Sequence, residues 1–496
     1  MWRLERRISL PVEIIVKYYL LVAVSAAALG SFSSRALAQH SGHEGHAAEP
    51  AAPEKPAEED HSTMDHSEPA QPAPADHSTM DHSPPAQPAP VDHTAMGHGA
   101  ADAAGHGAMT GAFGSYPMTR ESSGTAWQPD NSQHMGWMGQ SGDWTLMGHG
   151  ALNLVYSTQG GPRGDDKAFA AGILMGMASR TVGDGKLQVR AMLSPDPLMG
   201  KSGYPLLLAA GETANGVDRL IDRQHPHDFF MELSASISQN IGPKRSIFLY
   251  GGLPGEPAFG PPAFMHREAI LDSPEAPISH HWLDSTHISF GVLTAGLVLD
   301  RFKVEVSRFN GREPDEHRWN IETGPLDSTA VRLSWNPVAE LSLQGSWGRF
   351  KDPEQLEPGV DQTRWSASAL FAREIAPDVK LAATLAWGRK SIKHHDEYWN
   401  DDAYVAEASV KHAGWTFFGR GELTENRELL DEEEHSEAFR VGKVSVGAIR
   451  DFRMAEHVTL GLGGLFAVNF VPGGLAPLYG GNNPTGAMGF VRLKLD

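Results

Sequence analysis

Residues 339–348 read AELSLQGSWG. The odd positions of this stretch carry Ala, Leu, Leu, Gly and Trp, and the even positions carry Glu, Ser, Gln, Ser and Gly. Because successive side chains of a β-strand point to opposite faces, this alternation predicts a strand with one apolar and one polar face. The same pattern recurs at residues 186–193, 301–307 and 491–496, which indicates an all-β fold over most of the chain.

Two architectures produce such strands. A soluble sandwich turns its apolar faces inward, whereas a membrane barrel turns them toward lipid and its polar faces toward a wet lumen. We favour the barrel because charged residues alternate with apolar ones inside the strands, as Lys303 and Glu305 do with Phe302, Val304 and Val306. The sequence therefore predicts an antiparallel transmembrane β-barrel of about 12–16 strands.

The lengths and ends of the predicted strands support the barrel. Many reach the roughly 9–11 residues that a tilted spanning strand needs. We expect one strand at 204–211, a short turn at Asn336–Pro337, and longer loops at 253–284 and 391–401. Aromatic residues recur near strand ends, as interface girdles require: Trp144, Tyr250, Trp282, Trp335, Trp347, Trp365, Trp387 and Trp415.

The N-terminal part of the chain has a different composition. Basic residues precede an apolar run at 18–29, and Ala36-Leu37-Ala38 then offers a small-residue cleavage site, which predicts a secretory signal peptide. The next 77 residues or so are rich in Ala, Pro, His and Gly, with one aromatic, so we expect them to be disordered. The predicted organisation is a signal peptide at 1–38, a disordered segment at 39–115, a transition at 116–140 and the barrel at 141–496.

A repeat stands out within the predicted disordered segment. The motif His-x-x-Met-x-His occurs three times at a spacing of 16 residues, joined by Pro/Ala/Gln spacers. The alternative is a flexible linker whose His and Met residues have no role. Random sequence change in such a linker would not preserve the spacing of the motif in three copies. We predict that the motif residues are metal ligands: His61, Met64, His66, His77, Met80, His82, His93, Met96 and His98.

The ligand types point to copper. A thioether favours Cu(I), and an imidazole binds Cu(II) as well as Cu(I), so a site that offers both can hold copper ions in either oxidation state. Zinc alone would not need methionine, and silver, zinc and nickel are the alternatives among soft and borderline metals. Ligation needs the neutral imidazole, so metal affinity should fall below about pH 6.

The predicted barrel also contains candidate ligands. His225 and His227 flank Pro226 in a compact motif that could chelate a metal, although both rings could equally bond to backbone or carboxylate groups in packed loops. His266, His280 and His281 follow in the next predicted loop, and His287 lies at the start of the strand predicted after it. Methionines in the transition and first strands could carry Cu(I) onward or merely fill space: Met135, Met138, Met147, Met175, Met177, Met192 and Met199.

Composition excludes several other classes. The 496-residue chain has no cysteine and a formal net charge of −20. The absence of cysteine excludes a disulfide framework, a bacterial lipoprotein anchor and a blue-copper ligand set, and we expect neither an enzyme nor a nucleic-acid partner. No apolar run after the signal peptide is long enough for a transmembrane helix, so membrane insertion would be by strands.

The repeat resembles that of copper resistance protein B, a family of bacterial outer-membrane proteins with Met-Asp-His repeats ahead of a β-barrel. The matching residues are Met64-Asp65-His66 and Met80-Asp81-His82, with Met96-Gly97-His98 as a looser copy. This resemblance covers the repeat and the general plan, and it implies copper binding with export or sequestration. Residues 225–232 and 309–315 look more like an uncharacterised bacterial outer-membrane family.

These observations lead to two functional hypotheses. The first is a barrel in the outer membrane of a Gram-negative bacterium, whose periplasmic His/Met repeat binds copper and contributes to copper tolerance. Its partners would be copper ions, outer-membrane lipid and periplasmic copper proteins. The alternative is a general porin or solute channel in which the repeat only buffers metal.

Overall fold

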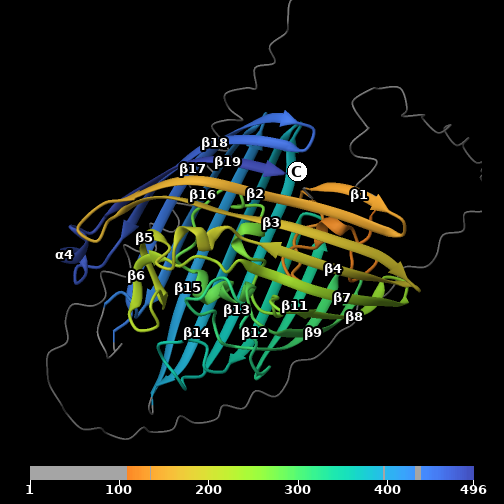
Figure 1. Ribbon diagram of the computed structural model, residues 1–496, viewed down its shortest axis with the longest axis horizontal. Helices are drawn as coiled ribbons and strands as arrows, with labels where there is room; N and C mark the ends of the chain where they lie inside the picture. Colours follow the sequence, from red (N-terminus) through yellow and green to blue (C-terminus); the bar gives the residue numbers. More distant parts are fainter. Residues whose placement is uncertain (1–108, 134–135, 395–396, 431–436, 496) are drawn as a thin grey trace, which may run out of the picture. The chain divides into compact units, whose positions relative to one another are not determined.

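The computed structural model describes residues 109–133, 136–394, 397–430 and 437–495. Within these residues, 16 antiparallel strands close into a barrel, because each strand pairs with the next along the wall and β19 pairs with β2 (Figure 1). This confirms the predicted fold class. The strands are β2 (Trp144–Gln159), β3 (Asp166–Val182), β4 (Gly185–Leu193), β7 (Phe230–Gly242), β8 (Arg245–Gly252), β9 (Val292–Leu299), β10 (Phe302–Phe309), β11 (Ser328–Val338), β12 (Leu341–Phe350), β13 (Gln362–Ala376), β14 (Val379–His394), β15 (Glu397–His412), β16 (Trp415–Asn426), β17 (Phe439–Ala455), β18 (Val458–Phe470) and β19 (Thr485–Leu495).

Three more strands and a few short helices complete the described elements. β1 (Trp137–Ser141) pairs with the beginning of β2, beside the position where β19 ends (Figure 1). No helix among the described residues is long and apolar enough to cross a membrane. The remaining elements are β5 (Tyr204–Thr213), β6 (Arg219–Gln224), η1 (Met118–Arg120), η2 (Asp196–Met199), η3 (Phe264–His266), α3 (His280–Leu283), η4 (Ser285–His287) and α4 (Ala476–Tyr479).

The wall of the barrel has an apolar outer face and a polar inner face. On β10, the side chains of Val304 and Val306 are 45% and 47% exposed, whereas those of Lys303 and Glu305 are buried in the lumen. Burial of charge with exposure of aliphatic groups is the reverse of a soluble domain, and it suits a wall that faces lipid. The alternation in the sequence thus predicted the orientation of this strand correctly.

Aromatic side chains mark both rims of the outer face. Trp335 and Trp415 are exposed near one end of their strands, and Phe302 stacks on Trp335 with ring centroids 5.5 Å apart. Trp365 and Phe470 are exposed near the opposite end. An apolar band between two aromatic girdles is the signature of an outer-membrane barrel. The protein is a membrane-spanning β-barrel of the outer-membrane type.

The two ends of the barrel differ. At the end that holds the terminus of β19, which we call the turn end, adjacent strands are joined by tight turns such as 183–184, 300–301 and 413–414. At the opposite, loop end, the connections are mostly long and include 194–229, 253–291 and 310–327. Short turns and long loops at opposite ends are the arrangement of outer-membrane barrels.

Three segments fill the lumen. The N-terminal segment (109–133) lies at the turn end, where Lys186 donates a hydrogen bond to the carbonyl of Thr110. The hairpin insert (194–229) and the long insert (253–291) enter from the loop end, and most of their side chains are buried. The lumen of this barrel is therefore occupied by the protein's own chain.

Several boundaries differ from the predictions. Residues 204–211 form β5 of the hairpin insert and not a strand of the wall. Residues 391–394 and 397–401, which were predicted to be part of a loop, belong to strands β14 and β15. Asn336 and Pro337 lie within β11 beside a β-bulge, and the turn follows them. The sequence analysis assigned residues 109–115 to the disordered segment. In the structure they are part of the N-terminal segment, and the ring centroids of Phe113 and Phe248 lie 4.6 Å apart.

Candidate functional site

The long insert is held to the wall by a buried arginine. Arg267 is completely buried, and its guanidinium donates two hydrogen bonds of 2.8 Å to the carboxylate of Glu407 on β15. The same guanidinium pairs with Asp284, further along the insert. Burial alone would raise the pKa of Asp284, but Arg267 and then His280 hold it below its usual range. Arg267 thus joins two parts of the insert to the barrel wall.

Further ion pairs join acidic groups of the long insert to basic groups of the wall. Lys443 on β17 pairs with Glu275 at 2.5 Å, and Lys411 on β15 pairs with Asp272 at 3.1 Å. Arg492 on β19 also pairs with Asp272. Charges that would be costly to bury alone are therefore compensated across the boundary between insert and wall.

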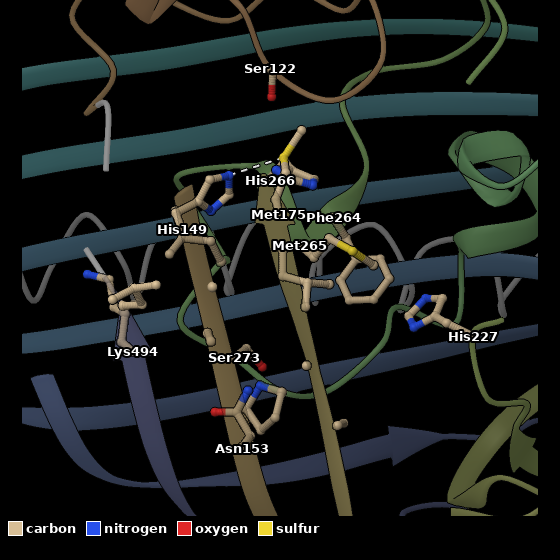
Figure 2. A pocket seen from close by; sticks show the side chains of 18 of the residues that line it. Ser122, His149, Asn153, Met175, His227, Phe264, Met265, His266, Ser273 and Lys494 are labelled. Carbon is tan, nitrogen blue, oxygen red and sulfur yellow. Dashed lines mark hydrogen bonds between the residues drawn. The ribbon is translucent and has the colours of Figure 1, made fainter. Parts of the chain in front are cut away.

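A cavity of about 200 Å³ remains between these segments and the wall. Strands β19, β2, β3 and β4 form one side, and the N-terminal segment, the ends of the hairpin insert and the long insert form the others. Its lining is rich in sulfur and imidazole (Figure 2): Met118, Met147, His149, Met175, Met177, His225, His227, Met265 and His266.

At one end of the cavity a thioether meets two imidazoles. Nε2 of His149 on β2 lies 3.2 Å from Sδ of Met175 on β3, and His266 lines the same end of the cavity (Figure 2). The ring centroids of His149 and His266 are 6.2 Å apart. Burial, then the neighbouring His149, lowers the pKa of His266 to about 3, so this imidazole is neutral and available as a ligand.

A row of histidines continues from the cavity into the inserts. The ring of His227 lies 5.2 Å from that of His287, which lies 5.2 Å from that of His280. His280 in turn lies 5.7 Å from His281 and 6.1 Å from His225. The local sequence explains the row, because short 3₁₀ and α turns at 280–287 bring three of these rings to one side of the insert.

The partners of these rings orient them. Nδ1 of His227 bonds to Asp196 at 2.8 Å, and Nδ1 of His280 bonds to Asp284 at 2.8 Å. The Nε2 atoms of His227 and His287 are buried and have no hydrogen-bond partner among the described residues. A histidine that is fixed through Nδ1 and presents Nε2 has the orientation that metal sites use.

The structure places the predicted ligands as follows. The motif residues from His61 to His98 lie outside the described residues, as does Met135. His225 and His227 lie in the lumen and line the cavity. Of the methionines, Met147, Met175 and Met177 line the cavity, Met192 packs behind them, Met138 is on β1, and Met199 belongs to another cluster.

Sequence reasoning missed His149 and Met265 as candidates. His149 occupies an inward position of β2, and a single His on a polar strand face gives no signal of its own. Met265 belongs to the long insert and contributes a further thioether to the lining of the cavity.

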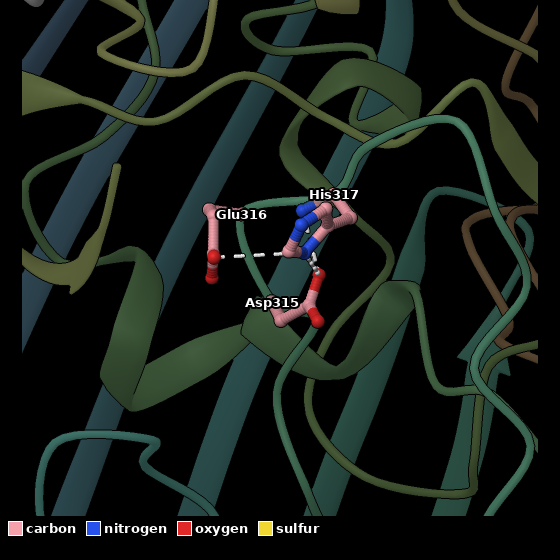
Figure 3. A group of neighbouring side chains, drawn as sticks. All are labelled: Asp315, Glu316 and His317. Atoms are coloured by element: carbon pink, nitrogen blue, oxygen red, sulfur yellow. Dashed lines mark hydrogen bonds and ion pairs between the residues drawn. The ribbon is translucent and has the colours of Figure 1, made fainter. Parts of the chain in front are cut away.

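Two groups of acidic residues lie near the loop end. Asp315, Glu316 and His317 cluster in the loop after β10, with Nδ1 of the histidine 3.2 Å from Asp315 (Figure 3). Glu354, Glu357 and Glu428 form a second group, but Arg219 pairs with two of these carboxylates. Neither group has a further feature that points to a bound ion, and acidic loop residues commonly face water.

Comparisons with known proteins complete the description. No family model matches the chain, and no curated protein matches it. Among solved structures, the Salmonella typhi OmpF complex with daunomycin covers 72% of this chain and 100% of its own, at 11% identity and a TM-score of 0.45. An anion-selective porin from Comamonas acidovorans covers 71% of this chain and 100% of its own, at 12% identity and a TM-score of 0.42. Outer-membrane expressed OmpT of Vibrio cholerae covers 72% and 100%, at 8% identity and a TM-score of 0.42.

Proposed function

We propose that this protein is an outer-membrane channel whose filled lumen restricts passage to small solutes. The proposal rests on one observation: a closed barrel of 16 strands encloses three segments that leave a cavity of about 200 Å³ between them and the wall. A barrel of this circumference has room for an aqueous path. The inserts occupy most of that room. A solute can therefore cross only through the space that the inserts leave, or through space that opens when they move.

Conductance of single molecules in a planar bilayer tests this function. We expect the full chain to give small, discrete steps in salt solution, well below those of a barrel of equal circumference with an empty lumen. Sugars should not cross proteoliposomes that contain the protein. Large ohmic steps would show that the lumen is open, and a membrane that stays silent at every voltage would rule out a channel.

A second proposal concerns copper. We propose that the His/Met repeat binds copper on the periplasmic side and so contributes to copper tolerance, without an enzymatic step. The support is the motif itself together with the position of residue 109, which enters the lumen at the turn end. In barrels of this type, short turns face the periplasm.

Metal titration of a peptide that comprises residues 39–108 tests the repeat. We expect binding of Cu(I) and Cu(II) at pH 7 and a loss of affinity below about pH 6, because exposed imidazoles protonate there and leave the metal. The matched control is a peptide of the same composition with the His and Met positions scrambled. Equal binding by the two peptides would show that the register of the motif has no role.

A further inference from the structure

We propose that His149, Met175 and His266 form a binding site for a soft monovalent ion, Cu(I) or Ag(I), inside the barrel. The site deepens the proposed channel function by naming the class of small solute that the cavity takes. It differs from the repeat, since its ligands come from β2, β3 and the long insert.

The distances suit a shared ion. With metal–ligand bonds of about 2.0–2.3 Å, a nitrogen and a sulfur on one tetrahedral ion lie roughly 3.5 Å apart. Nε2 of His149 and Sδ of Met175 are already at 3.2 Å. Two imidazoles on one ion place their ring centres roughly 5–6.5 Å apart, depending on the ligand angle. The 6.2 Å between His149 and His266 falls in this range.

The state of the ligands supports the same site. Nε2 of His266 is buried and has no hydrogen-bond partner among the described residues, although buried polar atoms normally have one. A neutral imidazole presents a lone pair that a metal ion can take up. An ion between His266 and Met175 would satisfy this atom, whereas the thioether opposite it is a poor hydrogen-bond acceptor.

The surroundings favour a soft ion over a hard one. Met175 belongs to a cluster with Met192, Met231, Ile288 and Phe290, against which Met177 and Met265 pack, so the sulfur faces an apolar shell. Thioether sulfur binds Cu(I) well and Mg²⁺, Ca²⁺ or Mn²⁺ poorly. Methionine also packs well without any metal, and an experiment must separate the two roles of the sulfur.

Silver is the probe because Ag(I) has the softness of Cu(I) and does not change oxidation state under assay conditions. The full chain, labelled with ¹³C at the methionine methyl groups, is titrated with Ag(I) in nanodiscs. The Met175 signal is the one that disappears in Met175→Leu. We expect this signal to shift with Ag(I), and Met175→Leu to bind one silver ion fewer than the native chain.

The matched control is Met192→Leu, which alters the same methionine cluster but does not line the cavity. We expect it to bind the native number of silver ions. His266→Gln should weaken the response of the Met175 signal by about tenfold or more, as loss of ligand-sphere interactions does at metal sites. His412→Gln, at the exposed turn end, should leave that response unchanged.

Two results would overturn the site. A Met175 signal that does not move once the other methyl signals are saturated would identify the contact as packing alone. A response to Zn(II) equal to that to Ag(I) would contradict the assignment to soft ions. The channel proposal fails separately: a barrel that never conducts but binds silver through Met175 refutes the channel and leaves the site intact.

Discussion

Replacement of Arg267 by alanine is expected to open the lumen. The substitution leaves the carboxylates of Glu407 and Asp284 in the interior without the guanidinium that compensates them. Removal of one partner from a buried pair costs about 3–5 kcal/mol. At about 1.4 kcal/mol per factor of ten, this cost raises the population with a displaced long insert by a factor on the order of 10² to 4 × 10³. Single-channel recordings should then show frequent large openings that the native chain lacks.

The control is Arg312→Ala, which removes an exposed pair with Asp352 in the neighbouring loop. Surface pairs contribute about 0–1 kcal/mol, so we expect native conductance. The hydrogen bonds that join the strands of the wall to one another do not involve Arg267. Both variants should therefore keep the mobility shift on heating that marks a folded barrel. A folded Arg267→Ala barrel with native conductance would mean that other contacts hold the insert.

The second large effect is expected on the outer face. Leu385 on β14 is 62% exposed and lies between the aromatic girdles. A charged arginine at this position would face hydrocarbon, where the cost on a barrel is about 2–4 kcal/mol near the midplane. We expect Leu385→Arg to lower the free energy of unfolding by this amount in lipid vesicles, measured by denaturant titration of tryptophan fluorescence.

Tyr398→Arg provides the comparison, because Tyr398 is 70% exposed on β15 close to the loop end of the same hairpin. The cost near an interface is about 0–1 kcal/mol. Equal losses at the two positions would contradict the placement of the lipid band. If Leu385→Arg leaves the free energy of unfolding unchanged, the outer face of β14 is not in contact with lipid at residue 385.

The strand pattern was predictable where one face is apolar and the other is polar. On β10, Lys303 and Glu305 were assigned to the lumen from alternation alone, and both are buried there. Residues 204–211 were wrongly predicted to be a strand of the wall. A short apolar run is equally compatible with a wall strand and with a hairpin packed inside the lumen, so the sequence pattern does not distinguish them. Residues 391–394 and 397–401 were harder to predict, because these ends of β14 and β15 consist mostly of polar and charged residues and show no clear apolar face.

The cavity was less predictable than the wall. A run of methionines indicated the strands that line it, since Met147, Met175 and Met177 all face it. The meeting of His149 with His266 depends on how the long insert folds back into the barrel, which local sequence does not encode. The single inward His149 becomes informative only when its neighbour across the lumen is known.

The seam between β2 and β19 has a consequence for biogenesis. The N-terminal segment precedes β2 in the chain, and Arg332 on β11 donates a hydrogen bond of 2.9 Å to Thr125 within it. Arg190 on β4 also donates a hydrogen bond to the segment, at the carbonyl of Gly124. These two contacts come from strands that lie far apart along the wall, so the segment can make both only after the wall has curled around it. We expect a barrel that stalls before β19 pairs with β2 to leave the segment more accessible to protease than the closed barrel does.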